Sequence, residues 1–250
     1  MNPEALPSEE EQFRTRVVLD FFRHDEKDLN NTEPKKTDEE VELTPKGRHD
    51  ARVHGKLADI KFAIATATDR VRAQQTAGYH MAGMVDGVTG DETSEELEQK
   101  INKGTKYGSK TRIDGRLNTY SNQISNIATI VLKYIEVAKN FDRLYESTEV
   151  SKRETNELQR FFGSHQGVTE PFLAKLIEMR RGVEEKDKFL SMLNKGGFDF
   201  SEGFKIMILN TDNESEPKIQ ISYKKEKNGE VFEFDEEITV DEIKELSLKE

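Results

Sequence analysis

Arg23 and His24 stand side by side at the end of an apolar run, and together they could bind an anion and attack it. A guanidinium offers two parallel N–H donors to phosphate or carboxylate oxygens, and a neutral imidazole is a nucleophile. The preceding run, VVLDFF (17–22), predicts a buried strand that is covered on both faces. Open parallel α/β sheets bind ligands at the carboxyl ends of their strands, so the pair lies where a site is expected.

Two later segments end in residues that could complete such a site. The apolar runs FAIAT (62–66) and LQRFFGSH (158–165) predict two further buried strands, and they lead into Thr68, Arg72 and His165. Because the carboxyl ends of parallel strands meet at one edge of a sheet, we expect all these side chains to lie close together. Two histidines with two arginines suit a dianionic phosphoryl group, which one histidine attacks while the other groups stabilise its oxygens.

The order of the predicted elements indicates an α/β fold. Thr44 and Pro45 form a helix start signal for a helix that runs to about residue 59. A second helix is expected from about Asp69, and apolar residues at helical spacing predict a long helix over 117–147, with a break near Asn140. Alternating strands and helices predict a three-layer α/β/α sandwich with a mainly parallel central sheet.

We expect one domain over residues 1–250, with three peripheral parts. Residues 1–13 are acidic and predict a mobile N-terminal arm, and residues 84–157 predict a helical cap insertion. Residues 203–236 predict C-terminal strands, and the last two segments, KIQISYK (218–224) and EVFEFDE (230–236), alternate in polarity. The sequence Lys-Asn-Gly at 227–229 indicates that the last two strands form a β-hairpin.

Composition limits the classes of partner. The formal net charge of −11 argues against nucleic acid and anionic membrane surfaces. No apolar run approaches the ~20 residues that a membrane span needs, and the acidic N-terminus has no apolar core of a signal peptide, so we expect a cytoplasmic protein. The chain has no cysteine, which excludes thiolate metal sites and a cysteine nucleophile.

Four motifs, in this order, resemble those of the histidine phosphatase superfamily, which is also called the phosphoglycerate mutase-like family. That family has Arg-His-Gly-Glu after its first strand, Leu-Thr-x-x-Gly at a helix start, a Ser or Thr followed by Arg-Ala-x-Gln-Thr-Ala, and a strand that ends in His. The matching segments here are RHDE (23–26), LTPKG (43–47), TDRVRAQQTA (68–77) and GSHQG (163–167). The resemblance spans residues 16 to about 180.

The resemblance implies a role for each matched residue. His24 would be the nucleophile that becomes phosphohistidine. The phosphoryl group would be bound by Arg23, Arg72 and His165, and Asn30 and Thr68 would line the pocket. Arg70 would be a neighbour of the site, and no metal or other cofactor would be needed.

Two departures concern the proton that the leaving group needs. Many family members carry a Glu in an Arg-Leu-x-Glu segment, and Thr119 stands at that place here. A hydroxyl is too weak an acid to protonate an alkoxide usefully. Asp25 replaces the glycine after the nucleophile, and Lys27 adds a cation near the mouth of the site. The candidates for the general acid are Asp25, Glu26, Asp114 and Glu98.

These observations predict a metal-independent phosphatase that hydrolyses a phosphomonoester or a phosphoramidate through a phosphohistidine intermediate. The alternatives are a non-catalytic module that binds a phosphorylated ligand and a phosphoglycerate mutase-type phosphotransferase. The expected partner is a small phosphorylated substrate or a phosphorylated protein. Activity should fall on the acid side of the pH profile as His24 takes up a proton and loses its lone pair.

Overall fold

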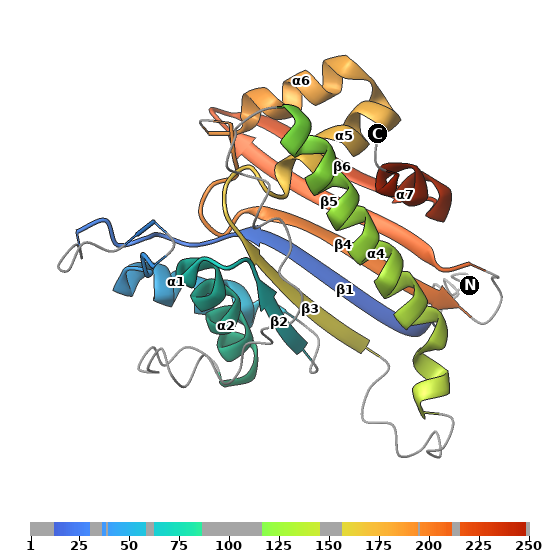
Figure 1. Ribbon diagram of the computed structural model, residues 1–250, viewed down its shortest axis with the longest axis horizontal. Coiled ribbons are helices and arrows are strands. Elements are labelled where there is room, and N and C mark those ends of the chain that lie inside the picture. Colours follow the sequence, from blue (N-terminus) through green and yellow to red (C-terminus); the bar gives the residue numbers. More distant parts are fainter. Residues whose placement is uncertain are drawn as a thin grey trace, which may run out of the picture.

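A six-stranded sheet forms the centre of the molecule (Figure 1). The computed structural model describes residues 13–30, 37–38, 40–58, 63–86, 117–145, 157–194, 196–211 and 216–248. The strand order is β2-β3-β1-β4-β5-β6. The strands are β1 (Phe13–Arg23), β2 (Ala63–Ala67), β3 (Glu157–Ser164), β4 (Gly203–Thr211), β5 (Lys218–Lys227) and β6 (Glu230–Ile238).

The sheet is mixed, which corrects the expectation of mainly parallel strands. The pairs β2–β3 and β3–β1 are parallel, whereas β1–β4, β4–β5 and β5–β6 are antiparallel. The short connections between β4, β5 and β6 allow only antiparallel pairing of these consecutive strands. The expected hairpin is confirmed, and its turn residues Asn228 and Gly229 have positive φ of 54° and 82°, as a tight hairpin turn requires.

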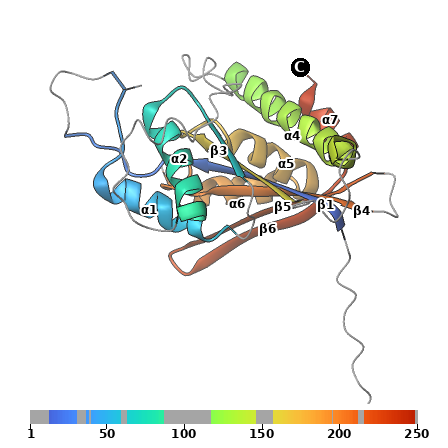
Figure 2. The same cartoon turned by 90° about the horizontal axis from the view of Figure 1, so that it is seen from below.

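Helices cover both faces of the sheet (Figures 1 and 2). Their bounds are α1 (Pro45–Lys56), α2 (Val71–Asp86), α4 (Leu117–Tyr145), α5 (Glu170–Arg181), α6 (Val183–Met192) and α7 (Val240–Ser247). Residues of α2 pack with Phe22 and Phe161 on one face. Residues of α4, α5 and α7 belong to the large core on the other face, where α4 and α7 lie together (Figure 2).

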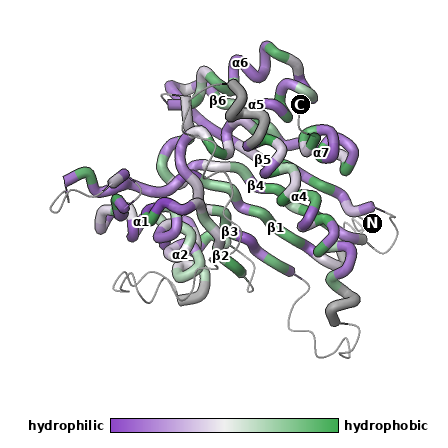
Figure 3. Tube along the Cα trace, in the orientation of Figure 1, coloured by the Kyte–Doolittle hydropathy of each residue, from purple (hydrophilic) through white to green (hydrophobic). Residues whose placement is uncertain are grey.

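Alternation along β1 explains how the central strand serves both cores. Leu19 and Phe21 are buried in the large core, and Phe22 is buried in the smaller core beneath α2. The Phe21 ring stacks on Phe162 of β3 at 4.5 Å and on Phe204 of β4 at 5.2 Å between ring centroids. Hydrophobic segments are accordingly concentrated in the inner strands (Figure 3). This packing fixes the end of β1 relative to its neighbours.

The structure confirms some of the predicted helix boundaries and contradicts others. Thr44 caps α1 and accepts a hydrogen bond from the Gly47 N–H. Helix α4 is continuous, and the predicted break near Asn140 is wrong because Ala138 and Phe141, on either side of it, pack into the large core. Helix α5 ends at Gly182 with φ of 90°, but α6 begins at once and was not predicted.

Helix α4 contacts β1, β4, α5 and α7, and so lies across the sheet. Most of the remainder of the predicted cap, 87–116 and 146–156, lies outside the described residues, as does nearly all of the predicted N-terminal arm. None of the described helices is long and apolar enough to cross a bilayer. The described residues also contain no group of three or more metal-ligating side chains that could hold a metal ion.

Candidate active site

His24 follows β1 and is held in one tautomer by its neighbours. Its Nδ1 lies 2.7 Å from the Asp25 carbonyl oxygen, which can only accept, so Nδ1 carries the proton. Its Nε2 lies 3.0 Å from Arg72 Nε, which can only donate, so Nε2 carries the lone pair. The ring is 2% exposed. The site therefore presents a neutral imidazole whose lone pair is on Nε2.

Arg72 and two further cations converge on the carboxylate of Asp38. Arg72 Nη2 lies 3.2 and 3.3 Å from the two Asp38 carboxylate oxygens. Lys27 Nζ lies 3.4 Å from Oδ1, and Arg70 forms an ion pair with Oδ2. Since Arg72 also donates to His24, the Asp38 carboxylate marks a position for an anion close to Nε2. Arg70 thus belongs to this cation cluster and is more than a neighbour of it.

Arg23 is directed toward the segment before β4. Its Nη1 donates to the Phe198 carbonyl oxygen at 2.5 Å, and its guanidinium carbon lies 5.0 Å from the centroid of the Phe200 ring. The Arg23 backbone N–H donates to the Glu202 carbonyl. This segment therefore fixes Arg23 beside the nucleophile, where its charge contributes to the electrostatics of the His24 ring.

His165 lies at the end of β3, as predicted, and is 2% exposed. Its Nδ1 is hydrogen-bonded to Thr68 Oγ1 at 3.1 Å. The Thr68 N–H donates to the Gly163 carbonyl, and the His24 N–H donates to the Ser164 carbonyl. The three strand ends are thus joined by backbone hydrogen bonds, and Thr68 orients a histidine.

The motif residues of α2 hold the loop that follows His24. The Thr76 hydroxyl accepts from the Asp25 N–H at 3.0 Å and donates to the Arg72 carbonyl at 2.8 Å. The Gln75 side chain accepts from the Leu43 N–H at 2.8 Å. The Gln-Thr pair of the motif therefore positions the backbone around the nucleophile, which gives a physical reason for these residue types.

The candidates for the general acid differ in where their carboxyl groups lie. Asp25 Oδ1 accepts from the Glu26 N–H at 2.7 Å, and Oδ2 accepts from the Ser201 hydroxyl at 2.5 Å. Glu26 accepts from Thr44 Oγ1 at 3.3 Å, at the start of α1. Thr119 falls in the first turn of α4. The two other candidates, Asp114 and Glu98, lie outside the described residues.

Burial sets the protonation of the two residues at the strand end. Desolvation, supported by the positive charges of Arg72 and Arg23, lowers the pKa of His24 to about 2. Desolvation raises the pKa of Asp25, although hydrogen bonds from Ser201 and Glu26 oppose it. His24 is therefore neutral at physiological pH, as a nucleophile must be.

Three contributors to the site were not found from the sequence. Asp38 occupies the cation cluster, and Ser201 holds the Asp25 carboxyl. Glu170 is buried, and it accepts from the N–H groups of Gly167, Thr169 and Phe198 at 3.0–3.1 Å. It links the turn after His165 to the segment that holds Arg23; a glutamate in a first helical turn was the one available signal. Asn30, expected in the pocket, is exposed.

The chain was compared with protein-family models, with curated proteins and with solved structures. No protein-family model and no curated protein matches the chain. A solved structure of the ecdysone phosphate phosphatase from Bombix mori in complex with tungstate is 13% identical, covers 78% of this chain and 89% of its own, and gives a TM-score of 0.41. Phosphoglycerate mutase from Bacillus anthracis is 18% identical, with 78% and 88% covered and a TM-score of 0.36.

Phosphoglycerate mutase from Plasmodium falciparum is 16% identical over 90% of this chain and 99% of its own, with a TM-score of 0.34. The chain is thus similar to solved phosphatases and mutases, at low identity.

Proposed function

We propose that this protein is a phosphatase that hydrolyses a phosphomonoester or a phosphoramidate through a phosphohistidine on His24. The proposal rests on one observation: the lone pair of His24 Nε2 lies next to a position that holds an anionic group. Arg72 contacts both the nucleophilic nitrogen and the Asp38 carboxylate that now fills that position. A phosphoryl group in place of this carboxylate would lie within reach of the nucleophile.

The reaction would proceed in two displacements. In the first, the Nε2 lone pair forms a bond to phosphorus while the bond to the leaving oxygen or nitrogen breaks, and the leaving group takes a proton. In the second, water attacks phosphorus, the N–P bond breaks, and inorganic phosphate leaves with a proton lost to solvent or a base. Arg23, Arg72 and His165 would stabilise charge on the phosphoryl oxygens in both steps.

The site is poorly arranged to supply the proton that the leaving group needs. Asp25 has the raised pKa that a general acid needs, but both of its oxygens are engaged by Ser201 and the backbone. We therefore expect the enzyme to favour leaving groups that need little protonation, such as a phenol or the imidazole of a phosphoramidate. Glu26, Asp114 and Glu98 are the remaining candidates for the acid.

Release of phosphate from phenyl phosphate tests the proposal. The His24→Ala variant should lose at least about a thousandfold in kcat, since nucleophile removal in a covalent mechanism costs that much or more. His49→Ala, which changes an exposed histidine on α1, is the matched control and should retain activity. Wild-type protein quenched during turnover should carry an acid-labile phosphoryl group that the His24→Ala variant lacks.

The same experiment addresses the alternatives. Tight binding of phosphate, without release of phosphate from any substrate, would identify a binding module. The contacts that occupy the carboxyl groups of Asp25 and Asp38 favour this alternative. Transfer of the phosphoryl group to an added alcohol in place of water would identify a phosphotransferase. Equal rates for wild type and His24→Ala would contradict the proposed mechanism.

A further inference from the structure

A groove borders the reactive histidine and continues onto the part of the sheet that α1 and α2 leave uncovered. Two adjoining cavities form it, with volumes of about 480 and 300 Å³. His54 lines both of them. A hydrogen bond also links their linings. Ser201, which lines the smaller cavity, donates to Asp25, which lines the larger cavity and directly follows His24 in the sequence. Because Asp25 directly follows His24, the groove begins next to the site.

Apolar side chains stand on both walls of the groove. Val53 and Leu57 project from α1, one helical turn apart, and Phe200 lies on the facing segment before β4. Val53 is 40% exposed, Leu57 is 74% exposed and Phe200 is 44% exposed, and they are three of the eight most exposed large apolar residues in the described part of the chain. Such exposure beside a site indicates contact with a ligand.

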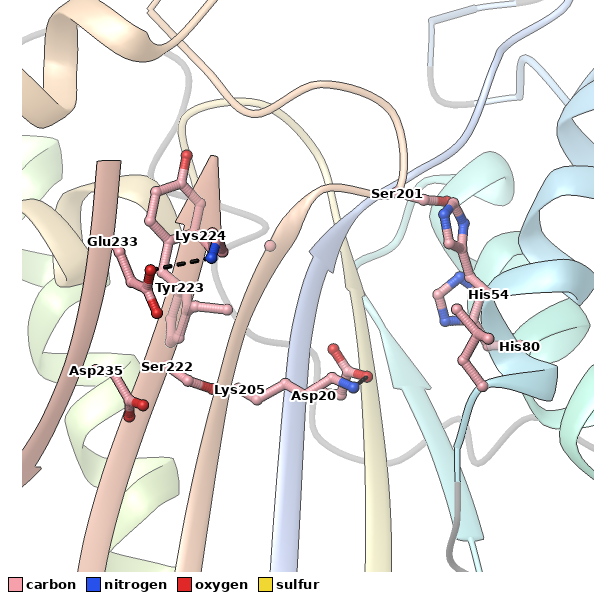
Figure 4. A pocket seen from close by; sticks show the side chains of 13 residues that line it. Asp20, His54, His80, Ser201, Lys205, Ser222, Tyr223, Lys224, Glu233 and Asp235 are labelled. Carbon is pink, nitrogen blue, oxygen red and sulfur yellow. Dashed lines mark ion pairs between the residues drawn. The ribbon is translucent and has the colours of Figure 1, made fainter. Parts of the chain in front are cut away.

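The floor at the far end carries polar groups that a ligand could engage (Figure 4). Asp20 of β1 lies 3.8 Å from Lys205 of β4, and desolvation raises the pKa of Asp20 to about 6. His80 lies instead beside His54, where the two cavities adjoin, with 5.9 Å between the ring centroids (Figure 4). It is 4% exposed, and its Nε2 has no hydrogen-bond partner among the described residues. A buried polar nitrogen without a partner is costly, and a ligand could supply one.

The groove as a whole is acidic. Its lining includes six acidic residues, namely Asp20, Asp25, Asp50, Asp199, Glu233 and Asp235. Three lysines of the lining oppose them, and each is paired with one carboxylate: Lys46 with Asp50, Lys205 with Asp20 and Lys224 with Glu233. Six acidic residues against three lysines leave the lining with a net excess of three negative charges. Charge complementarity therefore favours a ligand that carries positive charge away from its phosphoryl group.

The length of the groove restricts the size of that ligand. Asp20 precedes His24 by four residues on an extended strand, which places the two about 13 Å apart at ~3.3 Å per residue. A metabolite with only a few atoms beyond its phosphate would leave the far cavity empty. An extended peptide would cover the same distance with about four residues.

We propose that this groove binds the polypeptide of a phosphorylated protein substrate, with a basic residue about four positions from the phosphorylated one. The apolar side chains on the two walls would hold the intervening residues, and Asp20, Glu233 and Asp235 would attract the basic side chain. The inference rests on the proposed phosphatase function, and it narrows the substrate from any phosphorylated compound to a phosphorylated protein.

Nine-residue peptides with a central phosphotyrosine test this proposal. One peptide carries lysine four positions away on both sides, and its partner carries glutamate there. The lysine peptide should have a kcat/KM about tenfold higher at low salt, as charge complementarity of this kind gives. The double variant Asp20→Asn with Glu233→Gln should lose most of that preference, and its loss on the lysine peptide should exceed any loss on phenyl phosphate at least fivefold.

Asp187→Asn, an exposed change on α6 away from the groove, is the control and should keep the preference. Equal kcat/KM for the two peptides, with phenyl phosphate turned over, would overturn the groove proposal and leave the phosphatase standing. Failure to turn over any of the three would instead overturn the proposed function. In that case, titration of the two peptides onto the wild-type protein makes the same comparison by affinity, and equal affinities would again overturn the groove.

Discussion

The chemistry of this protein depends on how one imidazole is held at the end of a strand. The Asp25 carbonyl and the Arg72 guanidinium together leave His24 only one neutral tautomer, with the lone pair on Nε2. Burial strongly disfavours the protonated ring. A histidine in a solvated loop would be partly protonated near neutral pH, whereas burial keeps this one neutral.

The protonation of His24 should be visible in the stability of the fold. Below pH 6.5 the unfolded chain takes up a proton at this residue, whereas the folded protein does not until about pH 2, so stability is lost as pH falls. Between pH 7 and pH 5, wild type should lose about 2 kcal/mol of unfolding free energy relative to His24→Asn. Urea denaturation of both proteins at the two pH values measures this difference.

The comparison with His24→Asn cancels the contributions of all other groups, including Asp20, whose raised pKa acts in the opposite direction. An unchanged difference between the two proteins would mean that His24 titrates near its ordinary pKa. The structure also changes the expected pH profile, because protonation of His24 in the ligand-free protein now lies far below the pH range of most assays.

Among the elements, the loop between β1 and α1 has the largest influence on the site. It carries Asp38, whose carboxylate forms ion pairs with Arg70, Arg72 and Lys27. Under the proposed function a dianionic phosphoryl group would need these same cations, so Asp38 would have to be displaced before a substrate binds. The sequence of this loop is polar and aperiodic, and nothing in it indicates which residue would reach the cations.

Replacing Asp38 by asparagine should therefore strengthen phosphate binding. The removed ion pairs are partly exposed, and such pairs contribute at most about 1 kcal/mol, so we expect the Kd for inorganic phosphate to fall by up to about fivefold. Isothermal titration calorimetry of wild type, Asp38→Asn and the remote control Asp187→Asn measures this change. Weaker binding by Asp38→Asn would show that Asp38 supports the bound anion and does not compete with it.

At the scale of the whole molecule, the site depends on a core that lies on the other face of the sheet. Phe21 precedes the reactive pair by two residues, is fully buried and stacks between Phe162 and Phe204. These three rings belong to three adjacent strands, of which β1 and β3 end at the site. Packing on this face thus fixes how the ends of β1 and β3, and with them His24 and His165, lie relative to each other.

Truncation of Phe21 should cost a large part of the stability. Phe21→Ala removes a fully buried ring and should lower the free energy of unfolding by about 3–5 kcal/mol, or roughly 10 °C in Tm. Val18→Ala, at a half-buried position of the same strand, should cost clearly less. Thermal unfolding followed by circular dichroism measures both, and equal effects would contradict the central role given to the three-ring stack.

The sequence by itself determined which strands precede the site and which side chains could perform the chemistry. Continuous apolar runs and a Thr-Pro helix start are local signals, so β1, β2, β3 and the start of α1 were predicted closely. The arginines and histidines follow these strands in the chain, and their proximity followed from strand direction alone.

Only the tertiary structure decided what depends on contacts between distant segments. The antiparallel half of the sheet, the insertion of Asp38 and the link from Ser201 to Asp25 join segments that are distant in the sequence, and the last of these spans 176 positions. Local patterns carry no information on such pairings, because the same polar loop or short strand can be placed in several ways until packing selects one. The direction of the Asp25 carboxyl, on which the choice of general acid depends, was settled in this way.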